Sequence, residues 1–275
     1  MDLLQALLLG VVEGLTEFLP VSSTGHLTIT EQLVGLPIDD DSVTAFTAVI
    51  QVGAIAAVIV FFRRDIVRIV RAWVLGLVKP EHRGTFDHRF GWYVIAGTIP
   101  ILIVGKLGEP LVTGPLRNLW WVAGALIAWS AVMVLAERVG RQTRGENSVT
   151  LRDALLIGVV QCIALIPGVS RSGATISAGL FVGLDRVAAT RMSFFLSIPA
   201  LVAAGIYELP SALSGGIGVT ETVVATVVSF VIAYAAVAWL LRFVAHHSIT
   251  TFVWYRLAVG VALLVALGSG VLSAS

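Results

Sequence analysis

Two acids, a run of hydroxyl residues and a histidine lie together in one apolar segment near the start of the chain. The segment reads Glu13-Gly-Leu-Thr-Glu17-Phe-Leu-Pro-Val-Ser-Ser-Thr-Gly-His26. A charge inside hydrocarbon costs at least about 2.5 kcal/mol, so such residues indicate a functional site. Glu13 and Glu17 share one face of a helix, where two carboxylates can bind a hard cation or hold one proton between them. The alternative is a solvated helix end.

A second polar cluster, Pro167-Gly-Val-Ser-Arg-Ser-Gly-Ala-Thr175, interrupts another apolar segment. In both clusters hydroxyl residues stand where a helix would begin, and glycines allow the backbone to approach a ligand closely. Hydroxyl side chains cap free backbone N–H groups at such positions, and the same N–H groups with the helix dipole bind phosphate. The candidates for this binding are Ser22, Ser23, Thr24, Gly25, Gly168, Ser170, Ser172, Gly173 and Thr175.

Arg171, in the second cluster, most favours phosphate as the ligand. Its guanidinium keeps its charge, and its planar fork matches phosphate oxygens. The alternative is a structural ion pair with Glu13 or Glu17. A lone histidine is more often structural, but His26 stands beside the acids and is a candidate acid, base or nucleophile. Gln51 lies inside an apolar run; we expect it to join helices by hydrogen bonds, and it is a secondary candidate for the site.

The composition is that of an integral membrane protein. Of 275 residues, 57% are hydrophobic and 13% charged, with a mean hydropathy of +0.94, whereas soluble domains carry about 25% charged residues. Apolar runs near the membrane-spanning length predict helices and not a β-barrel. The net charge of +1 indicates no particular partner, and we expect the lipid bilayer and no nucleic acid. The predicted spans are 43–62, 90–107, 116–137, 187–208, 219–241 and 252–271.

Both polar clusters separate apolar pieces that are too short to cross a bilayer. Residues 2–18 and a piece ending near Gly35 form one pair, and residues 151–166 and 172–183 form the other. None comfortably reaches the roughly 20 residues that a span needs. We therefore predict two re-entrant helical hairpins, each with its turn near the middle of the membrane. A solvated loop containing Asp39, Asp40 and Asp41 follows the first hairpin.

Basic residues predict the orientation. Loops 63–89 and 138–152 are rich in arginine, and Arg186, Arg191, Arg242 and Arg256 are expected on the same side. The positive-inside rule assigns that side to the cytoplasm. Lys106 and Arg117 face the other way, and both termini are expected outside.

A shift of 148 positions aligns the two halves of the chain. Gly10-Val-Val-Glu13 meets Gly158-Val-Val-Gln161, and Val21-Ser-Ser-Thr-Gly25 meets Val169-Ser-Arg-Ser-Gly173. Three spans follow each hairpin, so the halves have opposite orientations. We predict an all-α fold of six transmembrane helices and two re-entrant hairpins in an inverted-topology repeat, and paired broken helices mark the binding site of such repeats. The single domain is 1–275, with repeats 1–137 and 149–271.

The two motifs resemble those of the undecaprenyl pyrophosphate phosphatase family, also called the bacitracin-resistance family, along essentially the whole chain. The resemblance implies a multi-pass enzyme of the bacterial cytoplasmic membrane. It would remove the terminal phosphate from undecaprenyl diphosphate at an outward-facing site and need a divalent cation such as Mg²⁺ or Ca²⁺. The family's functional positions fall on Glu13, Glu17, Ser23, His26 and Arg171, with Ser22, Thr24, Ser170, Ser172 and Thr175 around them.

Cleavage of a phosphoanhydride needs charge neutralisation and an in-line nucleophile. Arg171 and a cation held by Glu13 and Glu17 would supply the first. Ser23 is the preferred nucleophile. His26 could be its base, the acid for the leaving group or the nucleophile itself. An activated water is a further candidate for the nucleophile. The competing function is a transporter or flippase of a phosphorylated polyprenyl lipid, because inverted repeats are also transporter architecture. The sequence leaves a homodimer open.

Overall fold

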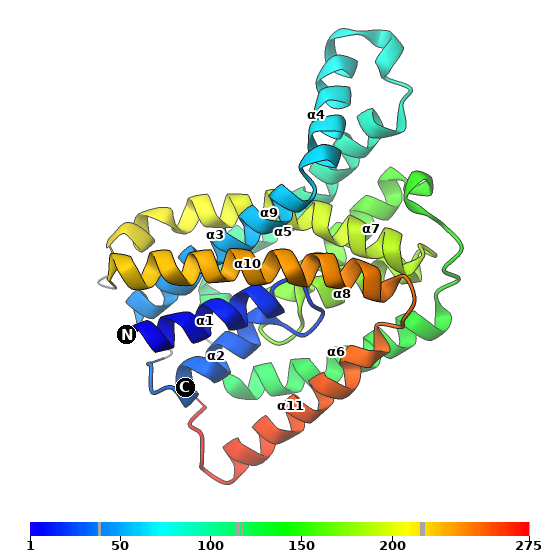
Figure 1. Cartoon of the computed structure of the whole chain (residues 1–275). Coiled ribbons are helices and arrows are strands. Elements are labelled where there is room, and N and C mark those ends of the chain that lie inside the picture. Colours follow the sequence, from blue (N-terminus) through cyan, green and yellow to red (C-terminus); the bar gives the residue numbers. More distant parts are fainter. Residues whose placement is uncertain (38–39, 114–115, 117, 215–217, 275) are drawn as a thin grey trace.

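The chain forms a bundle of helices (Figure 1), as predicted. The computed structural model describes residues 1–37, 40–113, 116, 118–214 and 218–274. The α-helices are α1 (Leu3–Thr16), α2 (Ser23–Leu33), α3 (Asp41–Phe61), α4 (Arg63–Val78), α5 (Phe86–Thr113), α6 (Leu119–Val139), α7 (Leu151–Gln161), α8 (Arg171–Phe181), α9 (Arg186–Ser214), α10 (Val219–Val244) and α11 (Thr250–Gly268). Short 3-10 turns lie at Pro80–His82, Glu146–Ser148 and Cys162–Leu165.

Six of these helices are long and apolar enough to cross a membrane, and they coincide with the six predicted spans. The chain is therefore a multi-pass membrane protein. Both termini lie at one end of the bundle, and the turn from α10 to α11 lies at the other (Figure 1), as the predicted topology requires. The apolar segments are Ser42–Phe61, Phe86–Gly108, Leu119–Val139, Arg186–Tyr207, Val219–Val244 and Thr250–Gly268.

Two pairs of short helices, α1 with α2 and α7 with α8, stand where the sequence predicts interrupted pieces. Each pair begins with a capping box, at Asp2 for α1 and at Thr150 for α7, in which side chains satisfy free N–H groups of the first turn. The helices have between 11 and 14 residues, so each is shorter than a span.

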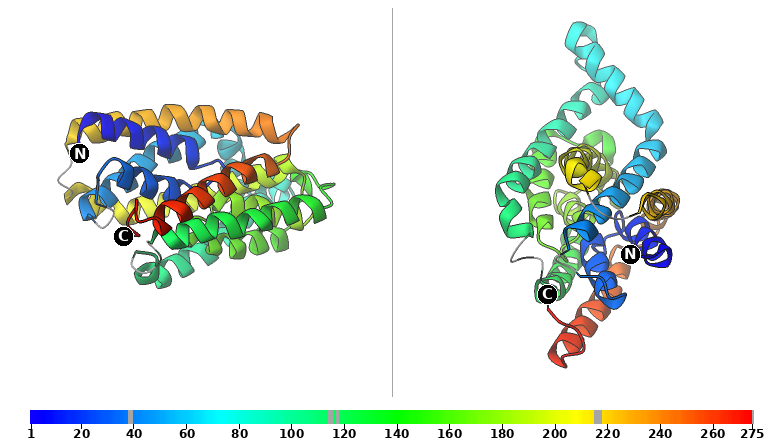
Figure 2. Two further views of the ribbon diagram at one scale, coloured as in Figure 1. Left: turned by 90° about the horizontal axis from the view of Figure 1, so that it is seen from below. Right: turned by 90° about the vertical axis from the view of Figure 1, so that its left-hand side faces the viewer.

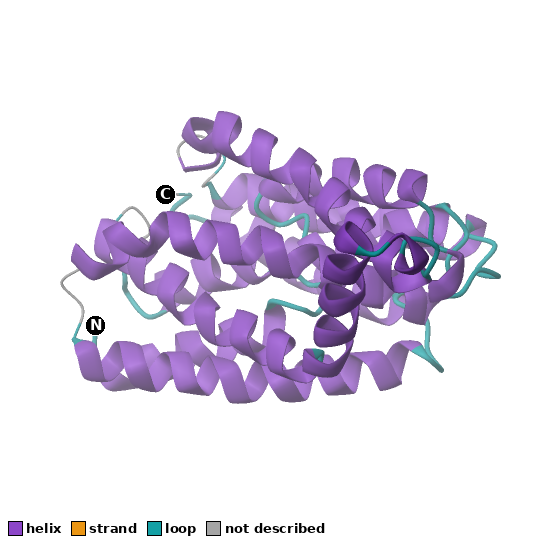
Figure 3. Cartoon of the chain, turned by 90° about the horizontal axis from the view of Figure 1, so that it is seen from above, coloured by secondary structure: helices purple, strands orange, loops and turns teal. Residues whose placement is uncertain are grey.

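The first helix of each pair packs on a long helix from the other half of the sequence. A Cβ atom at Gly10 of α1 would lie 2.6 Å from the carbonyl oxygen of Ala225 in α10. Similarly, a Cβ atom at Gly97 of α5 would lie 2.7 Å from the carbonyl oxygen of Ala154 in α7. Small residues let the backbones touch, as in membrane helix pairs generally. Figure 3 shows the described residues as a bundle of helices joined by loops.

The segment 63–89, expected to be a loop, begins instead with the helix α4. Ile69 and Gly76 of α4 are buried, and the ring of Trp73 contacts that of Trp92 in α5 with centroids 5.4 Å apart. The arginines obscure this pattern in the sequence, but the apolar residues between them recur at helical spacing. Together α4 and the start of α5 form a projection from the bundle (Figure 2).

The segments predicted to share one side do meet. Arg191 of α9 pairs with Asp65 at 3.1 Å and with Glu146 at 2.8 Å, which joins the start of α4 to the segment between α6 and α7. The predicted acidic loop is partly wrong, because Asp41 is the first residue of α3 and Asp40 caps that helix by accepting from the Ser42 backbone N–H. Asp39 and Arg117 lie outside the described residues.

Candidate functional site

The two helix breaks meet in the middle of the bundle. Ser172 donates to the carbonyl oxygen of Leu19 at 2.8 Å, and the Gly168 backbone N–H donates to Ser22 Oγ at 3.2 Å. Gly168 has a φ of +96°, and a Cβ atom there would collide with the Val122 carbonyl. Two clusters about 150 residues apart in the sequence therefore form one structure, as the motifs predict.

Ser22 and Ser170 cap the two half-helices in the same unusual conformation. Their φ angles are +80° and +77°, which is uncommon for residues other than glycine. The Ser22 hydroxyl accepts from the Gly25 N–H at 3.4 Å, and the Ser170 hydroxyl accepts from the Gly173 N–H at 3.1 Å. The predicted capping role is confirmed. The remaining N–H groups of each first turn have no carbonyl partner within their own helix and are free to bind an anion.

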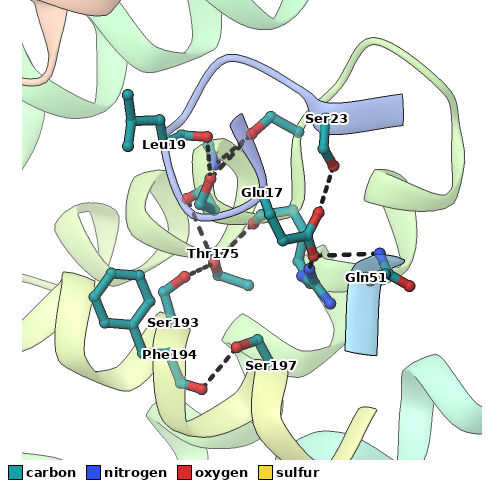
Figure 4. Close-up of polar contacts among 12 residues, drawn as sticks. Glu17, Leu19, Ser23, Gln51, Thr175, Ser193, Phe194 and Ser197 are labelled. Atoms are coloured by element: carbon teal, nitrogen blue, oxygen red, sulfur yellow. Dashed lines mark hydrogen bonds and ion pairs between the residues drawn. The ribbon is translucent and has the colours of Figure 1, made fainter. Parts of the chain in front are cut away.

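The Glu17 carboxylate contacts residues from both helix breaks (Figure 4). Ser23 Oγ donates to Glu17 Oε2 at 2.5 Å, Gln51 Nε2 donates to Glu17 Oε1 at 3.4 Å, and Arg171 forms an ion pair with Oε1. Glu17 is almost completely buried. The ion pair foreseen as the alternative for Arg171 is thus present, and it satisfies a buried carboxylate.

Glu13 lies one helical turn before Glu17 and is 1% exposed. Neither of its carboxylate oxygens has a hydrogen-bond partner among the described residues. The two acids are therefore buried together, and the alternative of a solvated helix end is wrong. A buried carboxylate without donors is costly, so this side chain is suited to receive a proton or a cation.

A cavity of about 210 Å³ lies against Glu17 and the residues of both breaks, whereas Glu13 does not line it. Its polar wall combines both clusters with two glutamines, and its apolar wall comes from α5, α9 and the turn after α7. Gln51 therefore belongs to the site, and Gln161 is a site residue that we did not predict. The alignment of Gln161 with Glu13 was the signal that could have found it. The polar lining is Glu17, Ser22, Ser23, Thr24, Gln51, Gln161, Ser170 and Arg171, and the apolar lining includes Ile101, Leu165, Ala200, Leu201 and Ala204.

Ser172 and Thr175 do not line the cavity; they lie behind it. The Thr175 hydroxyl donates to the Arg171 carbonyl oxygen at 2.8 Å and contacts the Ser193 hydroxyl at 2.6 Å (Figure 4). Ser172 holds the Leu19 carbonyl of the opposite break. These predicted binding residues therefore position α8 and its arginine. Gly25, Gly168 and Gly173 likewise shape the breaks without lining the cavity.

His26 is directed away from the cavity. Its Nδ1 lies 2.8 Å from the Ser22 carbonyl oxygen, and its Nε2 lies 2.8 Å from the hydroxyl of Tyr255 in α11. Because a carbonyl only accepts, Nδ1 donates to it, and the neutral ring accepts from Tyr255 at Nε2. The ring thus supports the turn at Ser22. Tyr255 was not predicted, since nothing local distinguishes it from other aromatic residues in spans.

Arg256 was placed on the arginine-rich side, which is wrong. It is fully buried within α11. Its guanidinium donates to the carbonyl oxygens of Gly168 at 2.9 Å, Val169 at 3.1 Å and Pro20 at 3.2 Å. These carbonyls are freed where the helices break, so the arginine satisfies acceptors of both breaks. Its position inside an apolar run was the available signal.

The chain matches the family model described as "Bacitracin resistance protein BacA" over residues 6–262. Undecaprenyl-diphosphatase 1 of Streptomyces coelicolor is 60% identical over 269 residues, which cover 98% of this chain and 97% of that protein. The undecaprenyl-diphosphatase of Acidothermus cellulolyticus is 57% identical over 275 residues and is covered completely, as is this chain. The Mycolicibacterium smegmatis undecaprenyl-diphosphatase is 51% identical over 279 residues, again with both chains fully covered.

Proposed function

Because the chain belongs to the bacitracin resistance protein family, we propose that it hydrolyses undecaprenyl diphosphate to undecaprenyl phosphate and inorganic phosphate. The three relatives described above are named undecaprenyl-diphosphatase, after this reaction. One observation carries the proposal: Ser23, Glu17 and Arg171 from both helix breaks converge on the wall of one cavity. Nucleophile, base and phosphate-binding cation are thereby combined beside an apolar wall that suits a polyprenyl chain.

The diphosphate would bind between the first turns of α2 and α8. Free N–H groups and the positive ends of two helix dipoles face this region. Arg171 already points into the cavity, and its fork would exchange the Glu17 carboxylate for phosphate oxygens. The charge of the arginine is thus compensated both with and without substrate.

Ser23 is the nucleophile that the distances support best. Glu17 Oε2 accepts the Ser23 hydroxyl proton at 2.5 Å, which is the arrangement of an activated nucleophile. Ser23 Oγ would attack the terminal phosphorus as the anhydride P–O bond breaks, with undecaprenyl phosphate as the leaving group. Water would then hydrolyse the phosphoserine to inorganic phosphate and restore the hydroxyl. His26 is not the base in this scheme, because both of its ring nitrogens face other partners.

We further propose that Glu13 and Glu17 hold the divalent cation, Mg²⁺ or Ca²⁺. The partnerless, buried oxygens of Glu13 fit this role. No three His, Cys, Asp or Glu side chains gather among the described residues, so Glu13 and Glu17 would be the acidic ligands that these residues supply. When bound, the cation would neutralise charge on the transferring phosphoryl group. Restoration of phosphate release by Mg²⁺ or Ca²⁺ after EDTA treatment is the expected result.

The two short helix pairs would be re-entrant hairpins of an inverted repeat in the bacterial cytoplasmic membrane, with the site open to the outside. Two coincidences at the 148-residue spacing support the repeat. Ser22 and Ser170 share a positive φ, as do Gly35 and Gly183 at +74° and +90°.

A cysteine placed at Asp2 should react with an impermeant reagent in intact cells; protection until lysis would contradict this orientation. A homodimer is a separate proposal, to be tested by light scattering in detergent.

Phosphate release by the purified protein in detergent tests the function, because no transport can occur there. With farnesyl diphosphate we expect turnover by the wild type and a loss of at least about 100-fold for Ser23→Ala. His26→Ala should retain more activity than Ser23→Ala, since its ring lies outside the cavity. Acid quenching should trap phosphoserine at Ser23. No phosphate release by a folded wild type that still moves lipid between vesicle leaflets would favour the transporter instead.

A further inference from the structure

The helix α4 runs across the direction of the long helices. Figure 1 shows it leaving the bundle sideways, and the view along the bundle in the right-hand panel of Figure 2 shows the same projection. It starts at Arg63, two residues after α3 ends at Phe61. Because the long helices cross the bilayer, a helix that runs across them at this point would lie along the membrane surface, at the arginine-rich end.

One face of α4 is apolar and exposed. Val67, Val70, Val74 and Leu77 recur at helical spacing, and the first two are 65% and 52% exposed. The helix α5 contacts α4 at other positions, at Trp73, whose ring packs on Trp92, and at Gly76, which faces His88. An apolar stripe of this kind would be unfavourable if the helix were surrounded by water. On a helix that lies in the membrane interface it is buried among acyl chains.

The neighbouring face of α4 is basic and borders a cavity. A cavity of about 380 Å³ lies between α4 and the turn that leads into α5. Arg64, Arg68 and Arg71 line it, one helical turn apart from each other. The cavity also has apolar walls, so it offers both charge and hydrocarbon contacts. Its other lining residues include Val67, Leu75, His82, Thr85 and Asp87.

The positive charge of this cavity is only partly neutralised. Arg68 pairs with Asp65 at 3.2 Å and with Asp87 at 3.1 Å. Arg64 and Arg71 are exposed, and neither forms an ion pair with any residue that the structure describes. Two guanidinium groups are therefore available at the level of the lipid headgroups. Guanidinium binds phosphate through paired hydrogen bonds.

We propose that α4 binds an anionic phospholipid of the leaflet at the arginine-rich end. The headgroup phosphate occupies the cavity beside Arg64 and Arg71, and the acyl chains lie along Val67, Val70 and Val74. Juxtamembrane basic clusters attract anionic lipids in this way. The site is separate from the catalytic cavity, with which it shares no lining residue, and it does not rest on the proposed function.

Thermal unfolding in nanodiscs tests the proposal. Nanodiscs of phosphatidylcholine are compared with nanodiscs of equal parts phosphatidylcholine and phosphatidylglycerol. We expect phosphatidylglycerol to raise the Tm of the wild-type full chain by several degrees. The double variant Arg64→Gln/Arg71→Gln should lose most of that rise and retain full phosphate release in detergent. Both arginines are exposed, so the variant should fold.

The matched control is Arg138→Gln/Arg141→Gln, which removes two exposed charges elsewhere on the same side of the predicted topology. It should keep the rise in Tm. Equal loss in both double variants would mean diffuse surface attraction and would overturn a site on α4. A full rise in the α4 variant would also overturn it. Inorganic phosphate added to the phosphatidylcholine nanodiscs should not reproduce the rise; if it does so fully, the cavity binds free phosphate and not lipid.

Discussion

Glu17 contacts residues of both helix breaks. One carboxylate oxygen accepts from Ser23, and the other pairs with Arg171 from the opposite break. The sequence allows two interpretations of Arg171, a structural ion pair and a phosphate-binding arginine. The structure shows the first of these, an ion pair between Arg171 and the buried Glu17 carboxylate. Under the proposed function, substrate phosphate would replace this carboxylate as the partner of Arg171.

Gln161 is fully buried at the wall of the cavity, and neither atom of its amide has a hydrogen-bond partner among the described residues. A structural glutamine would be satisfied, since an unpaired buried polar group costs about 1–3 kcal/mol. We therefore expect Gln161→Met to leave the Tm unchanged or raise it. The same variant should raise the KM for farnesyl diphosphate about tenfold, the loss of one hydrogen bond to a charged group.

Thermal unfolding and steady-state kinetics on the same Gln161→Met preparation separate the two roles. A lowered Tm with an unchanged KM would assign the glutamine to the structure and not to the substrate. Gln161→Glu provides the opposite test, because it places a further carboxylate in the cavity. It should weaken binding of the diphosphate more than methionine does.

At the scale of elements, the two helix breaks are held by contacts from outside each helix. A positive φ at a serine costs about 1–3 kcal/mol and persists only when neighbours enforce it. At Ser22 the carbonyl accepts from the ring of His26, and the hydroxyl accepts from Gly168 of the other break. The first turns of α2 and α8 are thereby fixed before any ligand arrives, which favours binding through preorganised N–H groups.

The breaks and most of the polar lining of the cavity could be predicted because polar residues inside apolar segments are a local signal. The chemistry of Glu13, Glu17 and Arg171 follows from their types alone. The partners of Tyr255 and Arg256 could not be predicted in this way, because each lies over 80 residues away in the sequence, although the position of Arg256 in an apolar run is itself a local signal. The helix α4 was missed for another reason, since its arginines resemble those of a solvated loop.

Packing of α1 on α10 sets the position of Glu13 and Glu17. A Cβ atom at Gly14 would lie 2.6 Å from the Ser229 carbonyl oxygen. We expect Gly14→Ala to lower the free energy of unfolding by about 1–3 kcal/mol, as overpacking does. Gly124 is a matched control in α6, where an added Cβ meets no atom within 4 Å. Gly124→Ala should be neutral or stabilise by up to about 1 kcal/mol. Comparable losses in both variants, measured by thermal unfolding, would contradict this packing.

At the scale of the whole molecule, the two halves of the sequence are interleaved. The helix α1 packs on α10, and α7 packs on α5, so the first helix of each half rests on the other half. The cavity is correspondingly shared, with Ser23 from one half and Arg171 from the other. Because neither half contains a complete site, we expect the site to form only when both halves have folded together.

Arg256 joins the two helix breaks, since its guanidinium donates to the carbonyl oxygens of Pro20, Gly168 and Val169. Replacing it removes several hydrogen bonds from a charged donor, each contributing about 1.5–3 kcal/mol. We expect Arg256→Met to destabilise the protein by at least about 3 kcal/mol and to reduce phosphate release, although Arg256 does not line the cavity. Arg242→Gln, at an exposed position of α10, should change stability by less than about 0.5 kcal/mol. A wild-type Tm for Arg256→Met would show that the two breaks are held together without the arginine.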